Sequence, residues 1–211
     1  MLTASQIRQY RSQGYLLIQP AAPDGMLESL RKGADRITGR TRTDDWPHKR
    51  GIGDVDIWGV VHLHHPDVRE PVLAEYMASD QVIEVVADLL EVSSSGPDTP
   101  LQLELVNMLV NPARENSEIG WHRDLVSTSQ PPELELAELR KATYAVQWNT
   151  ALYEDTCLLI VPGRHKRAST EQERAVVAHR PKDDLPWPDD GGTGSRPRRI
   201  LQRQPASQGP I

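Results

Sequence analysis

A histidine and an aspartate stand two residues apart in the string Trp121-His122-Arg123-Asp124. In an extended segment, side chains at this spacing project from the same face of the backbone, so both can reach one metal ion. An imidazole and a carboxylate are two of the three protein ligands of the facial triad that binds non-haem Fe(II). His122 and Asp124 are therefore candidate metal ligands, and a surface turn with a charged pair is the alternative.

The remaining histidines do not supply a third ligand at a convincing spacing. Only His165 and His179 follow Asp124 in the chain. His165 belongs to a Pro-Gly turn, and His179 lies in a segment without a strand pattern. The other cluster precedes Pro66 and predicts a loop and the start of a helix: His62, His64 and His65.

A second informative string is Val161-Pro-Gly-Arg-His-Lys166, which follows an acidic turn at Glu154-Asp155 and a tryptophan-bearing segment. Together with Trp-His-Arg-Asp and the opening Leu2-Thr3 and Gly14-Tyr-Leu-Leu-Ile18, it resembles the phytanoyl-CoA dioxygenase family. The resemblance covers residues 1 to about 185. Arg164 stands where that family usually has serine.

The resemblance implies a double-stranded β-helix, a jelly-roll or cupin-like fold, with flanking N-terminal helices. It also implies Fe(II), 2-oxoglutarate as cosubstrate, and oxidation of a C–H bond of a small organic substrate by O2. His122 and Asp124 match the first two iron ligands of the family. The family's distal histidine, and the later arginine that pairs with the far carboxylate of the cosubstrate, have no counterpart at the matching place. We therefore expect the chain as written to be an impaired dioxygenase.

Three amide side chains lie on segments that predict strands near the metal pair. Leucines alternate with other residues over 101–111, and Asn107 shares the leucine face. Gln147 and Asn149 share one face of a second predicted strand, 143–151. These amides are candidates for binding the cosubstrate, and strand-edge or turn hydrogen bonding is the alternative.

Helices are predicted in the first part of the chain. Thr3 and Gln6 form a capping box for a short helix that Gly14 would end. Apolar residues at helical spacing predict a second helix near 24–38, and two more between Pro66 and Leu90.

Strands are predicted mainly in the second part, where Leu158–Val161 adds a third to the two above. Helices first and strands afterwards favour an α+β fold, with a helical part at 1–92 and a β-helix core at 100–165. The polar segment 39–65 predicts a loop, and four of its residues are candidates to line a pocket: Trp46, Asp54, Asp56 and Trp58.

Composition limits the classes of partner. The 211 residues carry a net charge of −6 without a basic stripe, which argues against nucleic acid. No apolar run approaches the length of a membrane helix, and no secretory signal is visible. The single cysteine excludes an internal disulfide and favours a cytoplasmic setting. We expect a small-molecule substrate, and the sequence does not indicate an oligomeric state.

The last residues, 186–211, are rich in proline and glycine and predict an irregular tail. Back-translation in the next reading frame permits the family's missing strand, A-V-F-Y-N-A-N-L-L-H-R-G, over 198–209. Gln204 can then encode only Asn or Ser and Gln208 only Arg or Lys, as the strand requires. The sequence favours an out-of-frame tail over a genuine rearranged one.

Two other functions remain open. The missing third ligand is compatible with a catalytically inactive jelly-roll, either a pseudoenzyme or a small-molecule binding module. A zinc hydrolase that uses His122, Asp124 and His179 is a further alternative, although no general base lies at a convincing spacing.

Overall fold

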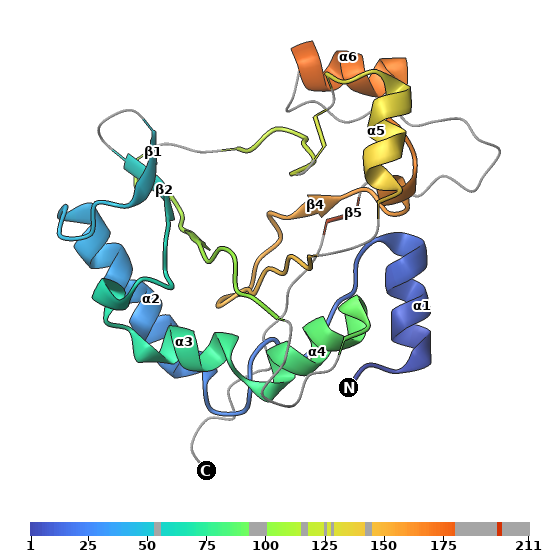
Figure 1. Ribbon diagram of the computed structural model, residues 1–211. Coiled ribbons are helices and arrows are strands. Elements are labelled where there is room, and N and C mark those ends of the chain that lie inside the picture. The colour runs from blue at the N-terminus through green and yellow to red at the C-terminus, as the bar shows by residue number, and fades with distance from the viewer. Residues whose placement is uncertain are drawn as a thin grey trace.

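Helices and short antiparallel strands alternate along the chain in the computed structural model (Figure 1). The structure describes residues 1–52, 56–92, 101–114, 118–124, 126–127, 129–141, 145–179 and 198–199. In Figure 1, helices α2, α3 and α4 follow one another along the lower edge, and α5 and α6 lie together at the opposite edge. The described elements are mixed helix and strand with a small antiparallel sheet, as expected of the predicted α+β class, and the predicted jelly-roll stays a prediction.

The first helix, α1 (Ala4–Gln13), begins and ends where the sequence predicts. The Thr3 hydroxyl accepts a hydrogen bond from the Gln6 backbone N–H, and the Gln6 side chain accepts one from the Thr3 N–H. Gly14 adopts φ +83° and donates its N–H to the Tyr10 carbonyl. A left-handed residue of this kind commonly ends a helix because glycine has no Cβ to clash.

Three further helices enclose the main apolar core. They are α2 (Leu27–Arg42), α3 (Pro71–Met77) and α4 (Asp80–Leu90), with a 3-10 turn at Pro66–Val68 before α3. The predicted second helix and the predicted pair between Pro66 and Leu90 are confirmed. The buried core cluster comprises Ala22, Leu30, Ile37, Trp46, Ile57, Val60, Leu63, Val68, Leu73, Tyr76, Met77 and Val82.

A three-stranded antiparallel sheet packs against α2. Its order is β1 (Lys49–Ile52), β2 (Asp56–Val60) and β3 (Met108–Leu109). The predicted loop over 39–65 is therefore wrong for these strands. The polar composition of the segment gave no sign of β2. The residues of β2 are mostly buried because the strand lies between β1 and β3, a segment about fifty residues later in the chain.

The strands predicted in the second part are shorter than their sequence patterns. Only Met108–Leu109 forms a strand within 101–111, and residues 145–151 form none, while 143 and 144 lie outside the described residues. The alternating leucines of the first segment are largely exposed. Alternation indicates a strand face, but a strand exists only where another segment completes its hydrogen bonds.

The predicted strand at 158–161 is confirmed in part as β4 (Leu159–Ile160). It pairs antiparallel with β5 (Arg198–Arg199), which lies within the segment predicted to be irregular. Residues 180–197 and 200–211 lie outside the described residues, so the rest of the predicted tail is not tested.

Two helices were not predicted from the sequence, and both carry readable start signals. Helix α5 (Pro132–Leu139) begins at a proline, which suits the first helical position. Helix α6 (Glu171–His179) follows Thr170, whose hydroxyl accepts from the Glu173 N–H while the Glu173 carboxylate accepts from the Thr170 N–H. This is a capping box. Within the described ranges, no helix is long and apolar enough to cross a membrane.

Candidate metal centre and the polar network behind it

The two candidate ligands lie side by side on an exposed segment. His122 Nε2 is 3.3 Å from Asp124 Oδ1, and the side chains are 56% and 52% exposed. The other imidazole nitrogen, Nδ1, lies 2.7 Å from the Gly120 carbonyl oxygen. A carbonyl can only accept, so Nδ1 carries a proton, and Nε2 is the ring nitrogen that faces the carboxylate.

This geometry suits one metal ion between the two side chains. Nitrogen and oxygen ligands at about 2.1 Å from a metal, at a right angle, are about 3.0 Å apart. The observed 3.3 Å requires only a slightly wider angle. A metal ion between the unprotonated Nε2 and the carboxylate oxygen would be bound by both atoms. The hydrogen bond to Gly120 also fixes the ring, as such contacts do for metal-bound histidines.

The structure does not bring a third ligand to this pair. Among the described residues, no group of three or more His, Cys, Asp or Glu side chains is arranged to hold a metal ion. His165 lies instead against the C-terminal end of α1, where its Nε2 is 3.3 Å from the Arg11 carbonyl oxygen. His179 is the exposed last residue of α6.

The upstream histidines form an aromatic cluster and cap a turn. His62 contacts the rings of His48 and His64 edge to face, with centroids 5.2 and 6.0 Å apart. His65 precedes the 3-10 turn at Pro66–Val68, and its Nδ1 accepts from the Asp67 N–H. This confirms the predicted loop and helix start.

The three candidate amides are exposed, and the structure shows a partner for one of them. Asn107 Oδ1 accepts a hydrogen bond from the His62 N–H at 3.3 Å, which ties the segment before β3 to the end of β2. Gln147 and Asn149 are exposed on the chain before the acidic turn. In that turn, Asp155 Oδ1 accepts from the Cys157 N–H at 2.8 Å.

The residues predicted to line a pocket have different roles. Trp46 is buried, donates from its indole N–H to the Val61 carbonyl, and borders a hollow of about 740 Å³ together with His48 and His65. Asp56 accepts hydrogen bonds from the N–H groups of Ala113 and Arg114, so it holds a loop.

Trp58, another of those predicted pocket residues, is not among the residues that border the hollow. Trp58 receives the guanidinium of Arg50 over its ring, at 5.6 Å from the centroid. Asp54 lies outside the described residues.

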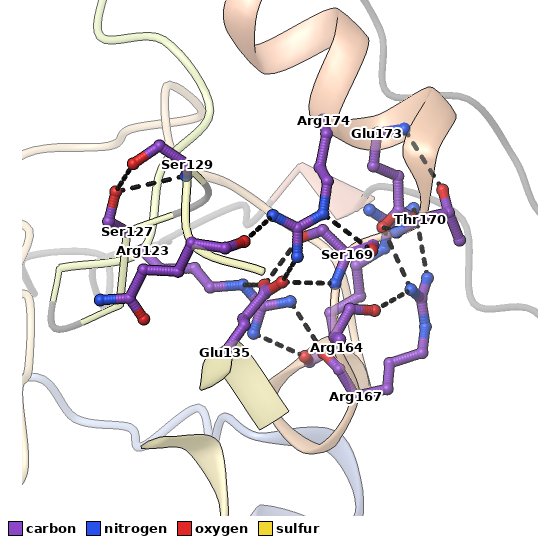
Figure 2. A network of polar contacts seen from close by, with 12 residues as sticks. Arg123, Ser127, Ser129, Glu135, Arg164, Arg167, Ser169, Thr170, Glu173 and Arg174 are labelled. Atoms are coloured by element: carbon purple, nitrogen blue, oxygen red, sulfur yellow. Dashed lines mark hydrogen bonds and ion pairs between the residues drawn. The ribbon is translucent and has the colours of Figure 1, made fainter. Parts of the chain in front are cut away.

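Arg123, the residue between the two ligands, points to the other side of the segment. Its guanidinium donates to the carbonyl oxygens of Arg164 and Arg167, at 2.9 and 3.1 Å, and its Nε is 3.4 Å from a carboxylate oxygen of Glu135 (Figure 2). The contacts join the two strings that carry the family resemblance, which lie more than forty residues apart. This role of Arg123 was not predicted from the sequence.

Two buried carboxylates organise the network behind Arg123. Glu135 of α5 is fully buried and accepts from the N–H and hydroxyl of Ser169, and it also pairs with Arg174. Glu173 of α6 is 2% exposed and pairs with Arg164 and Arg167. Figure 2 shows these arginines converging on the two carboxylates. The pairing gives Arg164 a partner at the position where the family usually has serine.

Burial disfavours the charged forms of the side chains in this network, and the ion pairs and hydrogen bonds between them favour the charged forms. Desolvation lowers the pKa values of Arg123 and Arg164, although the nearby glutamates act in the opposite direction. For Glu173, burial raises the pKa. Hydrogen bonds from Arg167 and Thr170 and the charge of Arg164 lower the pKa by more than burial raises it, so the net shift is downward. Glu173 is therefore held as a carboxylate.

The turn that supplies these carbonyls also caps α1. Gly163, with φ +76°, donates its N–H to the Gln13 carbonyl oxygen at 2.8 Å, and His165 donates from Nε2 to Arg11. The other nitrogen of His165, Nδ1, is buried without a hydrogen-bond partner. Burial lowers the pKa of His165, because a proton on Nδ1 would lack an acceptor.

We expect acidification to destabilise the protein through His165. A histidine with a lowered pKa contributes stability above its unfolded value of about 6.5 and loses it as the pH falls through the folded value. Denaturation at about pH 7.5 and about pH 5.5 should show a lower free energy of unfolding at the lower pH. His165→Gln, which retains the donor to Arg11, should reduce this difference, and His179→Gln should not. Equal pH dependence in all three proteins would contradict the assignment. Glu173 acts in a separate window, below about pH 4.5.

Comparison with known proteins identifies the family of the chain. The family model described as phytanoyl-CoA dioxygenase (PhyH) matches residues 10–200, which includes both the His122–Asp124 segment and the turn that anchors Arg123. Neither the curated proteins nor the solved structures contain a significant match. The chain belongs to the phytanoyl-CoA dioxygenase family. Members of this family are dioxygenases that generally use Fe(II) and 2-oxoglutarate.

Proposed function

We propose that the protein is an Fe(II)- and 2-oxoglutarate-dependent dioxygenase of a small organic substrate, on a jelly-roll scaffold and in the cytoplasm. The observation that carries the proposal is the opposed pair of His122 Nε2 and Asp124 Oδ1, 3.3 Å apart, in a member of a dioxygenase family. When bound, iron and 2-oxoglutarate together supply the activation of O2 that a protein side chain cannot provide.

The residues of this chain have defined tasks in that proposal. Gly120 accepts the Nδ1 proton of His122, which leaves Nε2 as the donor atom for the metal. Asp124 supplies the carboxylate oxygen from the same face. The half-exposed position of both side chains leaves room for a cosubstrate and a substrate beside the metal.

Amide side chains are proposed to bind the cosubstrate. Gln147 and Asn149 are exposed and can donate to a carboxylate. Asn107 uses its oxygen for the His62 N–H, so its amide nitrogen is the group that would donate. Exposure of these amides supports the assignment.

The chain as written is proposed to hold iron weakly, because the part that the structure describes offers two protein ligands at this place. The third is expected in the strand that back-translation of residues 198–209 in the next reading frame permits. Sequencing of the transcript tests that hypothesis, and a transcript without a frame break would contradict it. The two-ligand site also supports a second candidate function, an inactive binding module, because no third ligand joins the pair among the described residues.

Metal binding provides the test of the site. We expect anaerobic calorimetry with 2-oxoglutarate to show Fe(II) binding that His122→Ala and Asp124→Ala each weaken by about 100-fold or more, because each removes a ligand atom. His179→Ala is the matched control and should leave the affinity unchanged.

Each alternative has its own outcome in this experiment. Loss of binding in His179→Ala would favour the zinc-hydrolase interpretation, and unchanged binding in His122→Ala would refute the proposed site. Fe(II) binding without oxidative decarboxylation of 2-oxoglutarate would favour the inactive module. Iron-dependent decarboxylation by this chain would instead show that two protein ligands suffice.

A further inference from the structure

The segment that carries the two proposed ligands has little regular structure of its own. No helix or strand includes any of the described residues from 118 to 127. Two side chains that must hold a metal within a fraction of an ångström nevertheless need a fixed backbone. The contacts that fix this backbone must therefore come from outside the segment.

Arg123 makes such contacts. Its side chain is 18% exposed, and its donors meet two backbone carbonyls and one fully buried carboxylate. We propose that Arg123 is a positioning residue that fixes the 121–124 segment against the 163–167 turn and Glu135, and thereby sets the geometry of His122 and Asp124. This inference rests on the proposed iron site.

The contacts of Arg123 require the shape of a guanidinium group, and a positive charge alone would not reproduce them. The planar fork reaches the Arg164 and Arg167 carbonyls with two nitrogens, while the third faces Glu135. A lysine ammonium can neutralise the carboxylate, but it is a single point that cannot span all three acceptors. Arg123 is 18% exposed whereas His122 and Asp124 are 56% and 52% exposed, so anchoring Arg123 leaves both proposed ligand side chains free to face the metal.

Helix α6 offers a matched control in Arg174. Its side chain is also 18% exposed and also pairs with Glu135. Two of its further hydrogen bonds go to the carbonyls of Gln130 and Ser169. Loss of Arg174 therefore removes one partner of the same buried carboxylate but leaves the contact between Arg123 and the 163–167 turn in place.

The test compares Arg123→Leu, Arg123→Lys and Arg174→Leu in the full chain. One readout is Fe(II) affinity with 2-oxoglutarate, and the other is hydrogen–deuterium exchange of backbone amides in residues 118–124 without metal. We expect Arg123→Leu to weaken Fe(II) binding by about 10- to 100-fold and to accelerate exchange in that segment. Arg174→Leu should change the affinity by less than about threefold, and Arg123→Lys should restore stability better than it restores affinity.

The outcomes separate this inference from the proposed function. If His122→Ala abolishes Fe(II) binding but Arg123→Leu does not weaken it, the inference is wrong and the site stands. If Fe(II) binding does not depend on His122, the proposed function is wrong, and exchange alone decides whether Arg123 fixes the segment. Equal effects of Arg123→Leu and Arg174→Leu on both readouts would mean that the network acts only through general stability.

Discussion

Glu135→Ala is expected to lower the free energy of unfolding by about 4 kcal/mol, because it leaves buried arginines without their carboxylate. Glu135 is fully buried between Arg123 and Arg174, and it also accepts two hydrogen bonds from Ser169. Removal of one partner from a buried ion pair costs more than the pair contributes, since the remaining charge stays desolvated. Chemical denaturation measures the change.

The same helix provides the control for this prediction. Glu138 is 40% exposed and pairs with Lys141 at the surface. Exposed pairs contribute about 1 kcal/mol or less, so Glu138→Ala should change the stability only slightly. Glu135→Gln should lie between the two, because the amide still accepts from Ser169 but has no charge. A loss in Glu135→Ala no larger than that in Glu138→Ala would show that the arginines find water or other acceptors.

The network contains more guanidinium groups than carboxylates, and backbone carbonyls make up the difference. Arg123 uses two carbonyls of the 163–167 turn, and Arg174 uses those of Gln130 and Ser169. Such contacts depend on the fold of the turn and not only on the opposite charge. The stability of the network and the conformation of the Val161–Lys166 string are therefore coupled.

Local signals in the sequence were sufficient for the helices near the N-terminus. A capping box at Thr3 and Gln6, a glycine at 14 and apolar periodicity act over one or two turns, so they can be read from neighbouring residues. The capping box at Thr170 and Glu173 carried the same signal and was overlooked. The proximity of the His122 and Asp124 side chains was likewise predictable, because the direction of alternate side chains is a local property of the chain.

The sheet and the network could not be predicted in this way. Strand β2 owes its burial to β3, and Leu103 and Leu105 show a strand pattern without forming a strand in the structure. Glu135 is a charged residue on a short helix, and nothing in its neighbourhood shows that it is buried by arginines from other segments. Such pairings depend on contacts between residues far apart in the chain.

Gly14→Ala is expected to lower the free energy of unfolding by about 3 kcal/mol, through backbone strain and a clash with His165. Gly14 has φ +83°, and a Cβ there would lie 2.4 Å from His165 Nδ1 and 2.8 Å from Cγ. The imidazole cannot move away easily, because its Nε2 is bound to the Arg11 carbonyl. The added methyl should therefore displace the turn from the end of α1.

Gly25 separates the two causes. It has a similar φ of +76°, but a Cβ there would meet nothing within 4 Å. Gly25→Ala should cost about 1 kcal/mol, the strain of the left-handed conformation alone. The excess in Gly14→Ala then measures the clash, and it should largely disappear when both proteins also carry His165→Ala. Equal losses at the two glycines would refute a close contact between α1 and the turn, which is also the turn that anchors Arg123.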